Sequence, residues 1–338
     1  MVKVQTGGKL YIAGEYAILY PGQVAILKNV PIYMTALATF ADNYSLYSDM
    51  FNYTASLQPD KQYSLIQETI LLMEEWLINF GKNIKPIHLE ITGKLERYGL
   101  KFGIGSSGSV VVLTIKAMAA LYEIEMPSDL LFKLSAYVLL KRGDNGSMGD
   151  IACIAYEHLI SYSAFDRRAV SKMIETKPLE QVLEAEWGYR ITKIQASLEM
   201  DFLVGWTMQP SISKEMINIV KSTITQRFLD DTNYQVVQLL SAFKEGDKEA
   251  IKRCLEEISL LLFNLHPSIY TDKLQKLKEA SKGLDIVTKS SGSGGGDCGI
   301  AISFNKNDNQ TLIKRWESAG IELLSKETLS GQFDKMIT

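Results

Sequence analysis

The segment Lys101-Phe-Gly-Ile-Gly-Ser-Ser-Gly-Ser109 decides how the rest of the chain is interpreted. Its three glycines and three serines are too small to fill a hydrophobic core. They lead directly into an apolar segment, 110–122, in which Lys116 is the only charge. We predict that this segment is a helix buried on nearly all sides. Its first turn exposes backbone N–H groups, and a helix start of this kind attracts phosphate.

The composition places the chain among ordinary globular proteins and excludes several functions. The 338 residues suggest two domains. A net charge of −3 gives no electrostatic footprint for nucleic acid. The three cysteines are widely spaced, and none of the three histidines has zinc-ligand spacing. With no signal peptide and no long apolar run, we expect a cytoplasmic protein.

Strands and helices interleave along the chain, but the first 60 or so residues contain strands only, which favours an α+β fold. We place the domain change near 193, giving domains 1–193 and 194–338. In the first domain we expect strands within 2–40 with turns at 7–8 and 21–22, a hairpin at 43–57, helices at 62–80, 110–122, 127–141 and 151–158, and strands at 87–92 and 159–162. In the second we expect strands at 202–207, 285–288 and 298–304 and helices at 211–229, 233–244, 247–264 and 271–283.

Gly103-Ile-Gly-Ser-Ser-Gly108 also matches the dinucleotide-binding fingerprint, with acidic residues about 20 positions further on. The residues before it, 95–101, do not form a buried strand, which argues against a dehydrogenase. No lysine follows a glycine in a Walker A context, and the protein-kinase motifs are absent. A helix-starting turn without a ligand is the remaining alternative.

Three further motifs are ambiguous when each is taken alone. Ser290-Ser-Gly-Ser-Gly-Gly-Gly-Asp297 has the composition of a flexible linker, but it is short and lies between two apolar segments, so we predict a tight loop lining a cleft. Asp297 and the following cysteine are interpreted as structural. Lys9 on its own is typical of an exposed edge-strand lysine, and Asp150 is typical of a helix cap.

Taken together, the motifs are more specific. The segments Gly8–Gly22, Gly103–Ser109 and Ser290–Ile300 resemble, in order, the three motifs of the GHMP kinases. The resemblance spans nearly the whole chain. It implies an N-terminal domain like the second domain of ribosomal protein S5, a ferredoxin-like C-terminal domain, and an active site in the cleft between them.

The resemblance, together with the chemistry of the residues themselves, indicates roles for particular residues. The cofactors would be ATP and Mg²⁺, with Ser107 near the metal. The catalytic residues would be Lys9, Lys101 and Asp150. The loop that binds ATP would be Gly103, Ile104, Gly105, Ser106, Ser107, Gly108 and Ser109. The substrate would contact Lys9, Tyr16, Ser147, Asp150, Ser213, Lys214, Ser291, Gly292, Gly294 and Gly295. For Ser213 and Lys214, at the start of a predicted helix, an ordinary helix cap is an equal alternative.

Within the family, the Tyr11-Ile-Ala-Gly-Glu-Tyr16 form of the first motif is most similar to the bacterial branch that acts on phosphomevalonate. The implied reaction is ATP-dependent formation of diphosphomevalonate in isoprenoid precursor synthesis, by a monomer or homodimer. Mevalonate kinase, another small-molecule kinase or a decarboxylase of the same pathway are alternatives. A non-catalytic sensor of phosphorylated ligands on the same scaffold is a further one.

Overall fold

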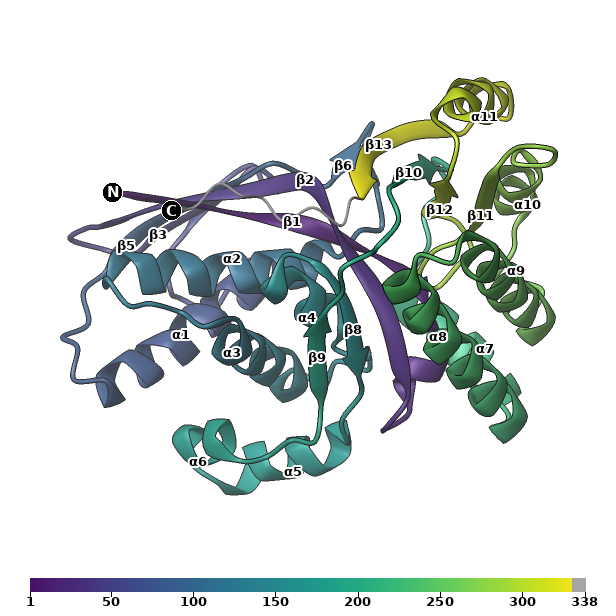
Figure 1. The fold of residues 1–338 in the computed structure, drawn as a ribbon. Coiled ribbons are helices and arrows are strands. Elements are labelled where there is room, and N and C mark those ends of the chain that lie inside the picture. Colours follow the sequence, from purple (N-terminus) through teal and green to yellow (C-terminus); the bar gives the residue numbers. More distant parts are fainter. Residues whose placement is uncertain (330–338) are drawn as a thin grey trace.

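The computed structural model describes residues 1–329 and contains two main β-sheets (Figure 1). The first sheet has seven strands in the order β4–β3–β5–β2–β8–β9, with β1 paired to β2. All neighbours are antiparallel except β3 and β5. The strands are β1 Val2–Ala13, β2 Val24–Phe40, β3 Ser45–Ser48, β4 Thr54–Ala55, β5 Ile87–Thr92, β8 Leu159–Ser163 and β9 Arg190–Lys193.

Helix α2, Ser106–Leu121, is the centre of the helical layer packed on this sheet. It contacts β1 and β2 on one side and α1, α3 and α4 on the others (Figure 1). Most of its side chains are buried, which confirms the prediction from its apolar sequence. The neighbouring helices are α1 Ser64–Asn79, α3 Ser128–Lys141, α4 Gly149–Tyr156, α5 Arg167–Thr176 and α6 Leu179–Glu184.

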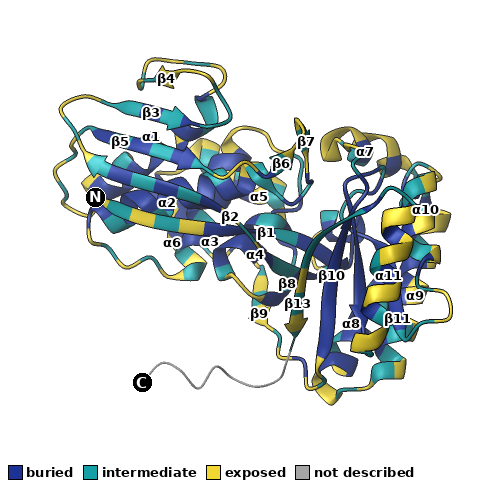
Figure 2. Ribbon diagram, turned by 90° about the horizontal axis from the view of Figure 1, so that it is seen from above, coloured by how far each residue is buried: buried dark blue, intermediate teal, exposed yellow. Residues whose placement is uncertain are grey.

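The second sheet has four antiparallel strands in the order β11–β12–β10–β13. Counted along this half of the chain, the order is second, third, first, fourth, which is that of a ferredoxin-like fold. Its strands are β10 Met200–Trp206, β11 Ile286–Ser290, β12 Cys298–Ser303 and β13 Glu322–Leu329. Its helices are α7 Ser213–Val220, α8 Gln226–Glu245, α9 Lys248–Leu265, α10 Asp272–Glu279 and α11 Lys306–Ser318. Figure 2 shows β10, β11 and β12 buried, whereas the edge strand β13 and the outer helix faces are partly exposed. The α+β fold class is confirmed.

Two local predictions are wrong. The glycines at 7–8 do not form a turn, because β1 runs through them with a shift of register against β2. A Cβ on Gly7 would lie 2.6 Å from the carbonyl oxygen of Val30, so close backbone approach explains this glycine. The break between the helices predicted at 211–229 and 233–244 is misplaced. Helix α7 ends at Val220, and α8 runs without interruption from Gln226 to Glu245, since the Thr225 side chain accepts the N–H of Phe228 and caps its start.

The two sheets are joined through the long strands β1 and β2, which contact α8 and α9 (Figure 1). Lys28 on β2 pairs with Glu327 on β13 at 2.9 Å. The first sheet ends with β9 at Lys193 and the second begins with β10 at Met200. We therefore propose 193/194 as the domain boundary, as the sequence predicted.

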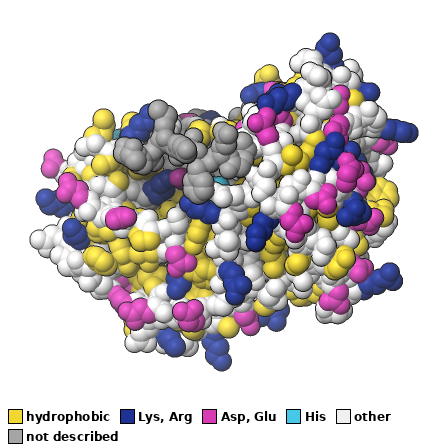
Figure 3. Space-filling model, viewed as in Figure 1, with side chains coloured by type: hydrophobic (Ala, Val, Ile, Leu, Met, Phe, Trp, Pro, Cys, Tyr) yellow, Lys and Arg dark blue, Asp and Glu magenta, His cyan; other side chains and the backbone are white. Residues whose placement is uncertain are grey.

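The surface carries charges of both signs, and on the face shown in Figure 3 they are interspersed without a large patch of one sign. This distribution agrees with the small net charge of −3. Among residues 1–329, no helix combines the length and apolar composition needed to cross a membrane.

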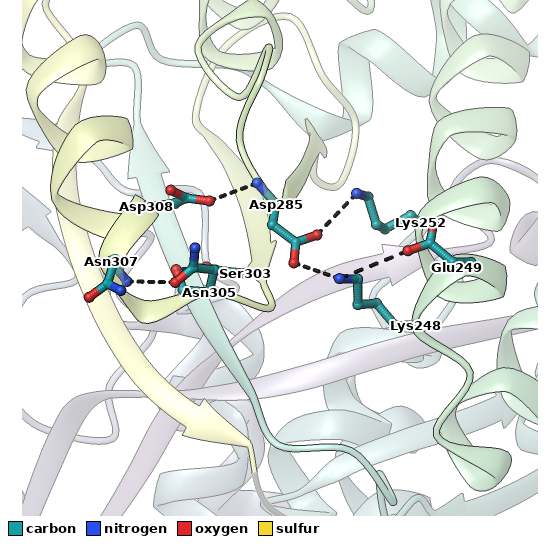
Figure 4. Close-up of polar contacts among 8 residues, drawn as sticks. All are labelled: Lys248, Glu249, Lys252, Asp285, Ser303, Asn305, Asn307 and Asp308. Atoms are coloured by element: carbon teal, nitrogen blue, oxygen red, sulfur yellow. Dashed lines mark hydrogen bonds and ion pairs between the residues drawn. The ribbon is translucent and has the colours of Figure 1, made fainter.

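The edge of the second sheet is held by a polar network around Asp285, just before β11 (Figure 4). Its carboxylate accepts Lys248 at 2.6 Å and Lys252 at 3.1 Å, both from α9. Its backbone N–H is donated to Asp308 of α11 at 2.8 Å. One aspartate thus ties a strand to two helices that are distant in sequence.

We predict that Asp285→Asn lowers the free energy of unfolding at pH 7 by about 1 kcal/mol, the upper range for partly exposed ion pairs. Burial acts to raise the pKa of Asp285, but hydrogen bonds from Lys248 and Lys252 outweigh it and hold the pKa below its ordinary value. The ionised form therefore stabilises the fold above the unfolded pKa of about 4, and this contribution is lost as the pH falls through the folded pKa. Urea unfolding between pH 7 and 3 should show the difference from wild type shrinking at the acid end.

The control is Glu199→Gln, because Glu199 and its partner Lys306 are both well exposed. It should unfold like wild type at every pH. An Asp285→Asn variant that behaves in the same way would show that the network contributes nothing to stability.

Candidate active site

Segments from both sheets meet around one cavity. They are the end of β1 and the turn after it, the start of the 103–109 loop, the loop before α4, the start of α7, and the glycine loop between β11 and β12. The lining residues are Lys9, Tyr11, Glu15, Tyr16, Ile18, Leu19, Gly103, Gly146, Ser147, Asp150, Ser213, Ile217, Ser291, Gly292, Ser293 and Asp297.

The loop 103–109 begins α2 in the way an anion site requires. Gly105 is the N-cap, with φ of 90° and no side-chain hydrogen bond to the helix start. The first N–H groups of α2 therefore have no intrahelical partner. The loop is fixed to β1, because the Lys9 N–H donates to the Ile104 carbonyl at 2.9 Å. A Cβ on Gly8 would lie 2.7 Å from the Ile104 side chain, so this contact requires glycine.

The predicted loop residues are not equivalent in the structure. Gly103 lines the cavity. The Ile104 side chain is buried, and the buried Ser109 hydroxyl lies 3.5 Å from the Gly7 carbonyl oxygen, so both point into the fold. Ser107 is exposed in the first helical turn, where its hydroxyl remains available to a ligand or metal.

Lys9 lies along this loop and supplies the one lysine or arginine of the cavity wall described above. Its Nζ is 5.1 Å from the centre of the Tyr11 ring, and its Cε would be 3.1 Å from a Cβ on Gly105. It is therefore not the exposed edge lysine that the isolated motif suggests.

Ser147 is placed by hydrogen bonds with two buried tyrosines, and Asp150 follows it at the start of α4. The Tyr11 hydroxyl is 2.8 Å from Ser147 Oγ, and the Tyr162 hydroxyl donates to the Ser147 carbonyl at 2.8 Å. Burial raises the pKa of both tyrosines, so both stay protonated. Asp150, in the first turn of α4, comes within 3.5 Å of where a Cβ on Gly108 would lie. The aspartate and the anion loop therefore adjoin.

Arg167 holds the same loop from outside the cavity. Its guanidinium donates to the carbonyls of Asn145 at 2.8 Å and Leu19 at 2.7 Å, and also to that of Gly146. Burial lowers its pKa from the usual value. One side chain thereby fixes the turn after Tyr16 relative to Ser147.

The glycine loop after β11 closes the cavity from the second sheet. Ser291 Oγ donates to the Tyr11 carbonyl at 2.8 Å, and the Tyr16 hydroxyl donates to the Ser293 carbonyl at 2.5 Å. The tight loop predicted here, rather than a linker, is therefore present. Gly292 lines the cavity, whereas Gly294 and Gly295 pack against Ile269 and Met216 outside it.

Two predicted lysines lie away from the cavity wall. Lys101 is exposed at the end of a short hairpin, β6 Glu96–Arg97 and β7 Leu100–Lys101, just before Gly103. Lys214 is exposed at the start of α7, next to Ser213, which does line the cavity. Roles for these two lysines stay predictions.

Sequence reasoning missed a buried ion pair between Glu15 and Lys289. The side chains are 2% and 1% exposed and lie 2.5 Å apart, although the residues are 274 positions apart in sequence. Lys289 also donates to the Ser290 carbonyl at 2.7 Å. The signal was a charge in each of two apolar contexts, Glu15 within the first motif and Lys289 directly before the third.

Asp297, interpreted from sequence as structural, is also part of the cavity wall. Burial raises its pKa to about 6, while the Ser211 N–H and Lys9 act in the opposite direction. No cluster of three or more histidine, cysteine, aspartate or glutamate side chains suited to a metal occurs within residues 1–329.

Two glycine loops that face one cavity from different sheets suit a protein that holds phosphate groups, and the class this defines is the small-molecule kinase. Family models agree. Residues 64–158 match the GHMP kinase N-terminal domain, and residues 239–322 match the GHMP kinase C-terminal domain.

Known proteins are similar to the chain over nearly its whole length. Phosphomevalonate kinase of Streptomyces sp. (strain CL190) is 29% identical over 93% of each chain. The structure of Streptococcus pneumoniae phosphomevalonate kinase in complex with phosphomevalonate and AMPPNP is 52% identical, covers 97% of this chain and 100% of its own, and superposes with a TM-score of 0.96. A mevalonate kinase structure, 19% identical with a TM-score of 0.74, covers 98% of this chain and 100% of its own and shares the fold. The chain belongs to the GHMP kinase family.

We predict that breaking the Glu15–Lys289 pair from one side, with Glu15→Leu or Lys289→Met, lowers the free energy of unfolding by about 3–5 kcal/mol, because a buried charge loses its partner. Replacing both, with Glu15→Leu and Lys289→Met, should recover most of that loss. Urea unfolding of the four proteins gives the coupling energy.

The matched control is the exposed pair Lys306 and Glu199, whose single variants should have no measurable effect on unfolding. Single losses at Glu15 and Lys289 that simply add in the double variant would show that the two charges do not depend on one another.

Proposed function

We propose that this chain transfers the γ-phosphate of ATP to phosphomevalonate, giving diphosphomevalonate. The observation that carries the proposal is the relative 52% identical over 97% of this chain, whose structure holds phosphomevalonate and AMPPNP. The cavity supports it, since hydroxyls of Ser147, Ser213 and Ser293 and the Lys9 ammonium provide donors for an anionic acceptor.

Phosphoryl transfer depends on positioning and on neutralising charge rather than on covalent help from the protein. The free N–H groups at the start of α2 would hold the phosphates of ATP. Ser107 offers an oxygen donor of the type that Mg²⁺ binds, in the first turn of the same helix. The bound metal would supply positive charge to the phosphates.

The acceptor decides which residues matter most. A phosphate monoester has a second pKa of about 6, so near neutral pH it has little proton left to remove. A base at Asp150 therefore has less to contribute than with a neutral alcohol such as mevalonate. The larger obstacle is the electrostatic repulsion between the two anionic substrates. The positive charges of Lys9 and Lys101 would reduce this repulsion.

Lys101 requires one further step. Its side chain is exposed on the β6–β7 hairpin, but it lies two residues before Gly103 in the cavity wall. We propose that the hairpin turns inward in the ternary complex and brings this ammonium to the bridging oxygen, where charge develops in the transition state.

The experiment that tests the acceptor is ADP release with mevalonate, phosphomevalonate and diphosphomevalonate. We expect turnover with phosphomevalonate and none with the other two. Turnover with mevalonate would favour a mevalonate kinase. ATP binding without turnover on any acceptor would favour a sensor of phosphorylated ligands.

We predict that Lys9→Ala and Lys101→Ala lower kcat by about 10²–10³, as expected for removing a charge that stabilises the transition state. Asp150→Asn should cost less, about tenfold, since the acceptor is already ionised. The measurement is steady-state kcat with phosphomevalonate at pH 7.5.

Lys3→Ala is the control, because Lys3 is an exposed lysine on the same strand as Lys9. Its kcat should equal that of wild type. Losses of similar size for Lys9, Lys101 and Asp150 would reject this ranking and make Asp150 a true general base.

A further inference from the structure

Asp297 is a buried carboxylate in the cavity that the proposed phosphoryl transfer does not use. It is 8% exposed, and its backbone is fixed on both sides. Its N–H donates to the Gln209 carbonyl at 2.6 Å, and its own carbonyl accepts the Thr207 N–H at 2.9 Å. Its φ of +52° is unusual for a residue other than glycine. The side chain is therefore held in one direction.

That direction is toward the start of the anion loop. A Cβ on Gly103 would lie 2.3 Å from Asp297 Oδ2, so this oxygen lies directly against Gly103. Oδ1 accepts the Ser211 N–H at 3.0 Å. Within residues 1–329 no side chain or backbone group donates a hydrogen bond to Oδ2. One oxygen is thus anchored, and the other borders the cavity.

The charged groups around Asp297 do not neutralise it. From β1 it faces Lys9, which forms no ion pair with it in the described structure. The loop 102–105, the segment 207–213 and the glycine loop 290–296 bring no ionisable side chain. Cys298, which follows, stays a neutral thiol because burial raises its pKa. Asp150 is the other aspartate that lines the cavity.

A phosphate group in this cavity would repel an ionised Asp297. Burial raises the pKa of Asp297 to about 6, and an additional anion raises the pKa of a carboxyl further. The neutral acid has an O–H to donate, and hydrogen bonds to charged oxygens are among the strong ones.

We propose that Asp297 binds a phosphate group in this cavity as a neutral carboxylic acid, taking one proton from solvent on binding and donating it in a hydrogen bond from Oδ2 to a phosphate oxygen. The proton returns to solvent when the phosphorylated ligand leaves. The proposal rests on the proposed function, because it takes the cavity as the site where acceptor phosphate and γ-phosphate meet.

The test is proton uptake on binding, measured at pH 8 by calorimetry in buffers of different ionisation enthalpy. At this pH the phosphate monoester and the free Asp297 are both ionised. We expect wild type to take up close to one more proton than Asp297→Asn, with either phosphomevalonate or Mg²⁺–AMPPNP as ligand. Above pH 7, the affinity of wild type for either ligand should fall by up to about tenfold per pH unit. The affinity of Asp297→Asn should lack this pH dependence.

The asparagine variant is the informative one because it keeps the geometry. Its amide oxygen can accept the Ser211 N–H, and its amide nitrogen can donate where the acid does. Asp297→Ala keeps neither group and should bind more weakly at every pH without the extra proton. Glu199→Gln, a neutralised exposed carboxylate, should take up protons as wild type does.

Equal proton uptake in wild type and Asp297→Asn would overturn the proposal. So would loss of AMPPNP binding by Asp297→Asn only when Mg²⁺ is present, since that result makes the ionised carboxylate a metal ligand. Absence of phosphomevalonate binding to wild type would instead reject the proposed acceptor. The Mg²⁺–AMPPNP arm would still decide the role of Asp297.

Discussion

The buried ion pair between Glu15 and Lys289 is the constraint on which the site depends. Removing two charges from water is costly, and their attraction repays that cost only when the geometry is well fixed. Here Glu15 follows β1, and Lys289 lies on β11 at the beginning of the glycine loop. Because both are nearly inaccessible to solvent, the first sheet can adopt few positions relative to the second that keep the pair intact.

Hydrogen bonds extend this constraint from the ion pair to the cavity. The Ser291 hydroxyl donates to the Tyr11 carbonyl, and the Tyr16 hydroxyl donates to the Ser293 carbonyl. The Tyr11 and Ser147 hydroxyls share a third hydrogen bond. Each bond joins segments more than 130 positions apart in sequence. Electrostatic stabilisation of a transition state requires hydrogen-bond donors that are held in a fixed geometry in this way. The side chains of Ser291, Tyr16 and Tyr11 thus fix the positions of other segments of the cavity wall.

Structural features that depend on local sequence pattern could be predicted from the sequence. The apolar run after Gly108 gave a buried helix, and the glycine-rich segments gave two loops facing one cavity. It could not predict contacts set by the tertiary fold. Lys289 looks like an ordinary strand lysine until Glu15 is placed beside it, and Asp297 looks structural until Gly103 is seen against its carboxylate. Gly7 was misread because close approach and a turn both require glycine.

The charges on the cavity wall indicate that further positive charge is needed before two anionic substrates can bind there. Glu15 is neutralised by Lys289, which leaves Lys9 against the carboxylates of Asp150 and Asp297. A wall with this balance does not attract two anionic substrates by itself. In the mechanism proposed above, positive charge would arrive with the nucleotide as Mg²⁺, from the Lys101 hairpin, or as a proton taken up by Asp297. On this proposal each source is present only when ligands are bound, so the positive charge would be assembled when the substrates are in place. That would favour transfer between them over loss of phosphate to water.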